Sequence, residues 1–118
     1  LNYLAYSWLE RNYKIELSME MLKEAYDLRK NDPYITDSLG WGYYLINDFE
    51  NAEKYLKKAV ELMPYDPIVN DHYGDILWML NRKIQARYFW NNVLNLDETD
   101  DEMKIDVKKK IIYGIEKT

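Results

Sequence analysis

The sequence repeats itself at a spacing of 34 residues, and this periodicity constrains the fold more than any other feature. The recurring pairs are Asp32-Pro33 with Asp66-Pro67, Asp37 with Asp71, Gly40 with Gly74, Asn47 with Asn81, Ala52 with Ala86 and Leu62 with Leu96. The period also continues backwards, with Leu56, Ala59 and Leu62 falling on Leu22, Ala25 and Leu28. A short repeated unit buries its apolar face only by stacking on its neighbours, so the sequence predicts an elongated array.

Each period holds two helical patterns separated by a turn. Apolar residues recur at spacings of three and four, first at Ile35, Leu39, Tyr43 and Ile46, then at Phe49, Ala52, Leu56, Ala59 and Val60. This spacing places an apolar stripe along one face of each helix. Asn47 and Asp48 predict the turn and the N-cap of the second helix, and Pro64 and Pro67 predict its end and the next start. The predicted helices span residues 1–12, 16–30, 34–46, 49–63, 68–80, 83–96 and 102–116, with an extra turn residue near Asn12-Tyr13.

Small residues predict close contact between the two helices of each pair. The facing pairs are Gly40 with Ala52 and Gly74 with Ala86. With no large side chain at the crossing, the two helix axes can approach closely. The larger Leu56 and Trp90 are then expected to fill the gap to the neighbouring repeat. A glycine without a packing role would only weaken its helix, by about 1 kcal/mol relative to alanine, and the recurrence favours the packing role.

A unit of about 34 residues with small residues at its eighth and twentieth positions resembles the tetratricopeptide repeat (TPR). The second repeat matches the motif at Gly40, Tyr43, Ala52, Ala59 and Pro64, and the third at Gly74, Ala86 and Leu96, with Glu98 where a closing proline is usual. The first repeat is the most divergent, with Ala5, Ser18 and Lys30 at the Gly, Ala and Pro positions. The stretches 37–41 and 70–75 are also similar to the last repeats of long bacterial TPR proteins, several of them lipoproteins or exported.

The resemblance implies an all-α fold, a right-handed superhelix of three helix-turn-helix repeats and a C-terminal capping helix. It also implies that the first helix of each pair lines a concave groove. The implied groove positions are Asn2, Tyr6, Leu9 and Glu10, then Tyr34, Asp37, Trp41, Tyr44 and Leu45, then Ile68, Asp71, Asp75, Trp78 and Met79. The candidate partner-binding residues among them are Tyr6, Glu10, Tyr34, Asp37, Trp41, Tyr44, Asp71, Asp75 and Trp78.

These candidates combine carboxylates with large aromatic side chains. Exposed aromatics are enriched at binding hot spots, although burial between helices is the alternative for Trp41 and Trp78. Asp37 and Asp71 would also suit the positive end of a helix dipole, and the two roles are compatible. A groove of this kind favours a protein or peptide with basic and apolar residues.

A comparison with one group of TPR domains disfavours another ligand. Those that capture the C-terminal carboxylate of heat-shock chaperones use Lys, Arg and Asn in this groove. At the corresponding places this chain has Asn2, Asp37, Asp71, Tyr6, Trp41 and Asp75, of which only Asn2 fits. Carboxylate capture is therefore not expected.

The rest of the sequence argues against catalysis, metal binding and several classes of partner. There is no cysteine, a single histidine, His72, and no glycine-rich phosphate loop, nucleophile elbow or zinc motif. The acidic run 97–102 lacks the glycine of a calcium loop and is interpreted as a turn and helix start. The net charge of −5 argues weakly against nucleic acid, and Lys108-Lys109-Lys110 is interpreted as a solvated face. No apolar run approaches the roughly 20 residues of a membrane span, so direct membrane insertion by this segment is not expected.

We therefore expect one TPR domain over residues 1–118, with repeats near 1–32, 33–66 and 67–100 and a capping helix near 101–116, as part of a longer protein. Its expected function is a non-enzymatic scaffold without cofactor or metal that binds a peptide or helical segment of a partner in its groove. The alternative is a structural or oligomerisation segment of a longer solenoid, and a homo-oligomer stays open. The compartment is not readable, because a missing cysteine suits a cytoplasmic or a periplasmic protein equally.

In the capping helix, the apolar residues Val107, Ile111, Ile112 and Ile115 are expected to cover the final repeat, while Lys104, Lys108 and Lys109 face water.

Overall fold

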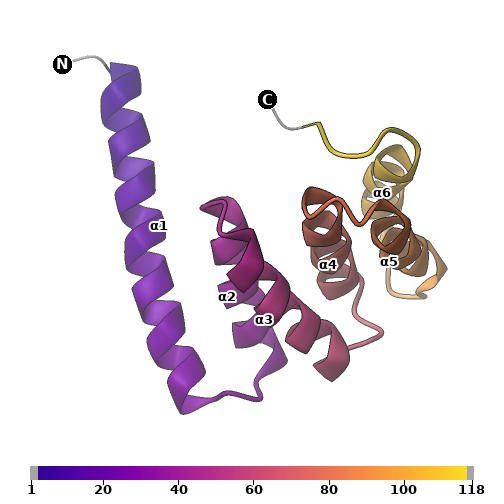
Figure 1. The fold of residues 1–118 in the computed structure, drawn as a ribbon, viewed down its shortest axis with the longest axis horizontal. Coiled ribbons are helices and arrows are strands. Elements are labelled where there is room, and N and C mark those ends of the chain that lie inside the picture. The colour runs from indigo at the N-terminus through magenta and orange to yellow at the C-terminus, as the bar shows by residue number, and fades with distance from the viewer. Residues whose placement is uncertain (1–2, 117–118) are drawn as a thin grey trace.

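The computed structural model describes residues 3–116, with side chains described from Lys14 onward, and this part of the chain contains six helices and no strand. The helices are α1 (Tyr3–Leu28), α2 (Pro33–Leu45), α3 (Phe49–Leu62), α4 (Pro67–Met79), α5 (Lys83–Asn95) and α6 (Asp101–Tyr113). They follow one another in sequence order from one end of the molecule to the other (Figure 1). α2 packs against α3 and α4 against α5, while α3 contacts α4 and α5 contacts α6. The predicted all-α solenoid of helical hairpins is confirmed.

An aspartate N-cap marks the start of α2, α4 and α6. Asp32 accepts hydrogen bonds from the amides of Tyr34 and Ile35, Asp66 accepts one from Val69, and Asp100 accepts one from Met103. Each carboxylate satisfies amides that have no partner within the helix. The three caps are 34 residues apart, so α6 begins where the first helix of a further repeat would begin.

The turns inside the two hairpins depend on asparagine. Asn47 and Asn81 adopt φ angles of 65° and 63°, in the left-handed region that asparagine tolerates better than most residues. Asp48 then caps α3 by accepting a hydrogen bond from the Asn51 amide, as predicted. At the equivalent position Arg82 provides no cap, and its guanidinium instead pairs with Glu53 at 3.1 Å.

The recurring glycines allow the hairpin helices to touch. A Cβ at Gly40 would lie 2.7 Å from Cγ of Leu56, and one at Gly74 would lie 2.5 Å from Cδ1 of Trp90. Leu56 and Trp90 are both fully buried. These two side chains fill the crossing of their own hairpin, a contact that the prediction did not include.

The first predicted turn is absent, which is the main correction to the expected helices. α1 runs without interruption from Tyr3 to Leu28, through the predicted turn at Asn12-Tyr13. Its 26 residues include no glycine and no proline, so nothing in this segment breaks a helix. The first helical hairpin is therefore replaced by one long helix that packs on α2.

The last helix also differs in part from expectation. Val107 is fully buried and Ile111 and Ile115 are partly buried against the core, as the apolar pattern predicts. Ile112, in contrast, is 67% exposed. α6 is thus rotated so that Lys110, expected to be solvated, takes a half-buried position.

Candidate binding face

The candidate binding face is formed by the first helices α2 and α4, and α6 continues it. α2 provides Tyr34, Asp37, Trp41 and Tyr44, and α4 provides Asp71, Asp75 and Trp78. The side chains of Tyr6 and Glu10 lie outside the described residues. The other predicted site residues can all be placed.

An aromatic stack lies between α2 and α4. The ring of Trp41 stacks on Tyr44 with centroids 4.4 Å apart and on the imidazole of His72 at 4.0 Å. The ring planes differ by 9° and 13°, so both contacts are nearly parallel. Trp41 and Tyr44 are three residues apart on one helix, which brings their side chains to the same side. The stack leaves all three side chains partly accessible.

Asp37 is held beside this stack by the only histidine of the chain. Nδ1 of His72 lies 3.0 Å from both carboxylate oxygens of Asp37. Asp37 is buried and His72 is half-buried. The pair links α2 to α4, so Asp37 serves the contact between repeats as well as the face itself.

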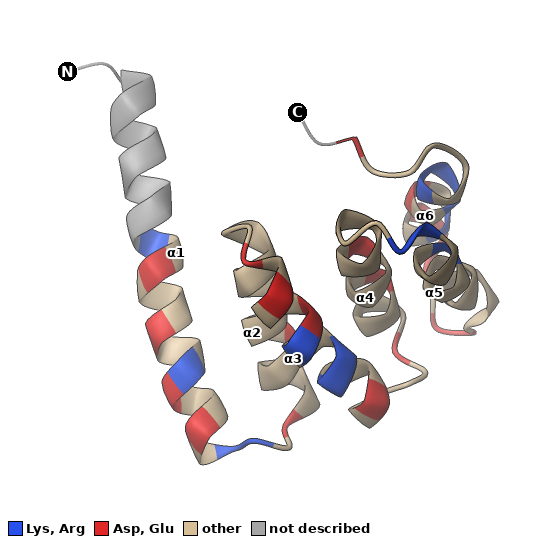
Figure 2. Ribbon diagram, in the orientation of Figure 1, with Lys and Arg blue, Asp and Glu red and all other residues tan. Residues whose placement is uncertain are grey.

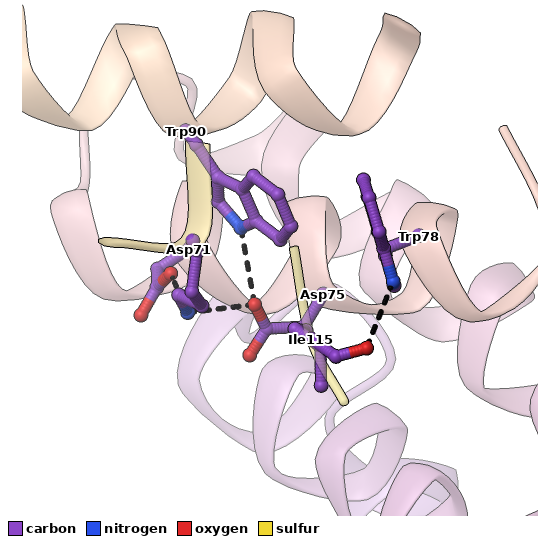
Figure 3. Close-up of polar contacts among 6 residues, drawn as sticks. Asp71, Asp75, Trp78, Trp90 and Ile115 are labelled. Atoms are coloured by element: carbon purple, nitrogen blue, oxygen red, sulfur yellow. Dashed lines mark hydrogen bonds and ion pairs between the residues drawn. The ribbon is translucent and has the colours of Figure 1, made fainter. Parts of the chain in front are cut away.

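The two carboxylates of α4 meet a lysine from α6. Nζ of Lys110 donates to Asp71 at 2.5 Å and to Asp75 at 2.7 Å. Nε1 of Trp90 donates to the same oxygen of Asp75 at 3.0 Å (Figure 3). Asp75 is only 7% exposed. It was expected to line an open groove, but it is enclosed between α4, α5 and α6.

This network changes the protonation equilibria of its members. Burial raises the pKa of Asp75 to about 6, the neighbouring Asp71 contributes to the rise, and Lys110 and Trp90 oppose it. Burial alone would lower the pKa of Lys110, but the charges of Asp75 and Asp71 outweigh it and the net pKa is raised. Burial, together with Asp75 and Asp71, raises the pKa of Tyr44 to about 12. One ammonium group thus stabilises two carboxylates, and Tyr44 stays a neutral hydrogen-bonding group.

Trp78 is covered by the chain segment that follows α6. Its Nε1 donates to the carbonyl oxygen of Ile115 at 3.1 Å (Figure 3). Gly114 ends α6 with a φ of 71° and lies directly against the indole ring, where a side chain would collide. Lys83 and Arg87 lie over the same ring at 4.9 and 5.1 Å from its centroid. Trp78 therefore already has a hydrogen-bond acceptor and two cations as partners inside the chain.

The open part of the face lies over α2 and the start of α4. Tyr34, Leu45 and Ile68 are exposed there, around the stack centred on Trp41. The predicted candidates therefore divide into two groups. Tyr34, Trp41 and Tyr44 border open surface, whereas Asp75 and Trp78 are engaged with α6 and the segment after it.

The sequence analysis did not predict the links of His72 to Asp37 and of Lys110 and Trp90 to Asp75. A signal was present, because Asp37 precedes His72 by 35 residues and Asp75 precedes Lys110 by the same number. The separation of 35 residues is one more than the repeat length. An acid and a base at this separation therefore lie on successive first helices, at repeat positions that differ by one. This offset could have predicted both links.

The described surface also has a hollow that shares no lining residue with this face. It has a volume of about 570 Å³ and is formed by the turns that precede α4 and α6, including Tyr65 and Glu98. The described residues contain no cluster suited to hold a metal ion. No helix among them is long and apolar enough to span a bilayer.

Solved structures resemble this architecture. One is the first TPR domain of Spaghetti (RPAP3) bound to the HSP90 peptide SRMEEVD, with a TM-score of 0.72 and 17% sequence identity. The match covers 87% of this chain and 82% of that chain. No family model and no curated protein matches the sequence. The structural likeness confirms the TPR fold that the sequence resemblance implied.

Proposed function

We propose that this chain is a protein-interaction scaffold that binds a peptide or helical segment of a partner across α2 and the start of α4. The proposal assigns it no catalytic role, because TPR folds serve protein interaction and no nucleophile–base set was found in the sequence. The observation that carries the proposal is the partly accessible stack of Trp41, Tyr44 and His72 with exposed apolar side chains beside it.

Aromatic side chains held in place by their neighbours are suited to anchor a ligand. Trp41 is restrained by two stacking contacts, so little conformational freedom remains to be lost on binding. Tyr34 is 65% exposed and provides a second aromatic surface about two turns away on the same helix. Such anchors typically dominate the binding energy of an interface.

The charges beside the stack favour a basic ligand. Asp37 is paired with His72, and Asp71 shares one lysine with Asp75. Two carboxylates therefore share a single ammonium group here, and the chain as a whole carries a net charge of −5. Arginine or lysine in a partner would be attracted by this potential and would stack on Trp41, each such contact contributing roughly 0.5–2 kcal/mol.

An acidic ligand would be disfavoured for the same reason. The RPAP3 domain is bound to the peptide SRMEEVD, which carries three carboxylate side chains and one arginine. In this chain Asp37, Asp71 and Asp75 occupy places where carboxylate-binding TPR domains use Lys, Arg or Asn. Partner preference is thus expected to differ although the fold is shared.

A random peptide library selected on the purified protein tests the proposal. Selected sequences should be enriched in basic and apolar residues, and their binding should weaken as salt rises. Trp41→Ala should weaken binding by about tenfold or more, and more than any single Asp substitution, because the anchor loses buried area as well as electrostatic attraction.

Two controls make the outcome decisive. Tyr65→Ala removes an exposed aromatic residue from the turn before α4 and should leave binding unchanged. The peptide SRMEEVD should bind weakly or not at all. Enrichment of acidic sequences, or equal binding by the Trp41→Ala protein, would show that this face is not the ligand site.

A further inference from the structure

A cavity lies among α1, α2 and α3, and it is lined mainly by lysine and tyrosine side chains. It has a volume of about 450 Å³, which is within the range of small-molecule sites. The lysines and tyrosines that line it are Lys23, Lys30, Lys54, Tyr26, Tyr43 and Tyr55. We call it the lysine–tyrosine cavity. It shares no lining residue with the candidate binding face.

Positive charges exceed negative charges at this cavity. Lys23, Lys30 and Lys54 form no ion pair with any carboxylate in the described part of the chain. Asp27 is the only acidic residue among those that line the cavity, so three ammonium groups are accompanied by one carboxylate. Basic residues occur on α1, on the turn after it and on α3 (Figure 2). This local excess is present although the whole chain carries a net charge of −5.

Two of the tyrosine rings hold lysine side chains in place without neutralising them. Nζ of Lys23 lies 5.6 Å from the ring centroid of Tyr43, and Nζ of Lys54 lies 5.3 Å from that of Tyr55. The two rings stack on each other with centroids 5.6 Å apart, so they form one aromatic wall between α2 and α3. A ring face attracts an ammonium group through its quadrupole but carries no net charge. The positive charges therefore remain available to an anion.

The third tyrosine provides a hydroxyl group that is prepared to donate a hydrogen bond. Nζ of Lys58 donates to the hydroxyl oxygen of Tyr26 at 2.7 Å and lies 4.9 Å from the centroid of the same ring. The oxygen acts as acceptor in this contact, so the hydroxyl proton is still free to be donated. A hydrogen bond from a hydroxyl group to an anion is charge-assisted and roughly twice as strong as a neutral one.

The repeat fold does not require these polar groups. A shift of 34 residues places the three tyrosines on Val60, Leu77 and Phe89, and it places two of the three lysines on Pro64 and Tyr88. The junction of α3, α4 and α5 is thus built at these positions without ammonium groups and with a single hydroxyl group. The hydroxyl and ammonium groups of the lysine–tyrosine cavity therefore belong to this junction rather than to the repeat.

We propose that the lysine–tyrosine cavity binds a phosphoryl group, either of a small organic phosphate or of inorganic phosphate. Such a group carries roughly two negative charges and three acceptor oxygens near neutral pH, which match the local excess of positive charge and the donors around the cavity. A carboxylate carries one charge and is recognised best by the planar fork of arginine, which this cavity lacks. Lysine binds phosphate as a point charge. The aromatic wall leaves a surface for the organic part of an ester.

Titration of the isotope-labelled protein with phenyl phosphate, followed by amide NMR shifts in a phosphate-free buffer, tests the proposal. Amides of α1, α2 and α3 around the cavity should shift and saturate with a Kd of about 1 mM or below. Binding should weaken as salt rises. Inorganic phosphate is the second probe. Tighter binding of phenyl phosphate assigns the site to an ester and equal binding assigns it to the free anion, and both results support a phosphoryl site.

Matched variants connect the binding to the cavity. Lys23→Gln combined with Lys54→Gln removes two ammonium groups at exposed positions and should raise the Kd about tenfold or more. Tyr26→Phe keeps the ring but removes the hydroxyl group, so it should raise the Kd severalfold. The control combines Lys57→Gln with Lys109→Gln, which removes the same total charge from exposed positions outside the cavity. Its Kd should stay close to that of wild type.

Four outcomes would overturn the proposal. The first is the absence of any saturable shift up to roughly 10 mM ligand, which is ten times the expected Kd limit. The second is a set of shifts located on α4, α5 or α6 instead of around the cavity. The third is an equal loss of binding in the control protein. The fourth is binding of benzoate as tight as that of phenyl phosphate, because benzoate presents a carboxylate on the same ring.

Discussion

Lys110 is the side chain that ties α6 to α4. Its ammonium group lies between Asp71 and Asp75 and 5.5 Å from the ring centroid of Trp90. An ion pair of this kind brings little net stability compared with an apolar replacement of the whole set, but removing one partner leaves buried charge unpaired. The residue thus decides whether two carboxylates can remain in this part of the structure.

Replacing Lys110 with methionine should lower the free energy of unfolding by about 3–5 kcal/mol. The methionine keeps most of the side-chain volume, so the loss reports the two unpaired carboxylates rather than a cavity. Urea denaturation monitored by circular dichroism measures the change. Lys109→Met is the matched control, since Lys109 is exposed, and it should change stability by no more than about 0.5 kcal/mol. Equal effects of the two substitutions would contradict the role assigned to Lys110.

Asp75 should make stability depend on pH in a direction opposite to most carboxylates. Its folded-state pKa is raised to about 6, above its ordinary value of 3.8, so the folded protein binds a proton between these values that the unfolded chain does not. The contribution of this group to stability therefore falls as pH rises from about 4 to about 6. A shift of this size corresponds to roughly 3 kcal/mol.

The comparison of wild type with Asp75→Asn isolates this effect. Asparagine can still accept the hydrogen bond from Trp90 but does not titrate, and Lys110 keeps Asp71 as a partner. The stability of wild type relative to Asp75→Asn should be highest near pH 4 and should decline towards pH 7. Denaturation curves at several pH values give this difference, and a difference that is the same at every pH would contradict the assignment.

Among the elements, α6 is the helix whose contribution is easiest to measure. It covers the last hairpin with Val107 fully buried and Ile111 partly buried, and Ile115 in the segment after it is partly buried as well. Burying such side chains contributes roughly 1.5–3 kcal/mol each on transfer scales, before conformational entropy is subtracted. Deleting residues 103–118 should therefore destabilise the domain by several kcal/mol or cause aggregation, and an unchanged melting midpoint would refute the capping role.

Two point substitutions within α6 test the same role without removing the helix. Val107→Ala should cost roughly 2 kcal/mol, because it deletes buried methyl groups and leaves a cavity. Ile112→Ala deletes more atoms but lies at an exposed position, so it should have little effect. Thermal denaturation of the two proteins shows which substitution destabilises more. A larger effect of Ile112→Ala would show that α6 packs through its other face.

Across the whole array, stability should decrease from the middle towards α1. Each helix contacts mainly its neighbours in sequence, as in other repeat arrays, and α1 packs mainly on α2. The largest cluster of buried residues comes from α3, α4, α5 and α6, and α2 adds the buried Leu39. Met19 is the only buried apolar residue among the described side chains of α1. Local opening should therefore cost least in α1.

Native-state amide hydrogen exchange measures this gradient. Amides of α4 and α5 should exchange most slowly, and those of α1 should exchange fastest among the helices. If α1 amides were protected as strongly as those of α4, the array would unfold as one cooperative unit and the nearest-neighbour description would be wrong.

Local and periodic signals were enough to predict the repeat, the helix boundaries from α2 to α6 within a few residues, and the small residues at each hairpin crossing. Proline, asparagine and aspartate act on the backbone within a few positions, and the apolar spacing of three and four describes one helix at a time. The same signals predicted a turn at Asn12-Tyr13 that is absent, because a weak breaker does not end a helix when strong helix formers continue on both sides.

Local signals did not determine which of the predicted site residues lie on open surface. That depended on how the helices pack against one another. Asp75 and Trp78 stand at groove positions of the repeat. Asp75 is nevertheless paired with Lys110, and the indole N–H of Trp78 donates to the carbonyl group of Ile115. Those partners lie 35 and 37 residues away, and the rotation of α6 that brings Lys110 inward depends on the packing of Val107 in the core. A repeat position specifies the direction of a side chain from its own helix. What meets it there is decided by the next helix, through contacts that no single helix pattern contains.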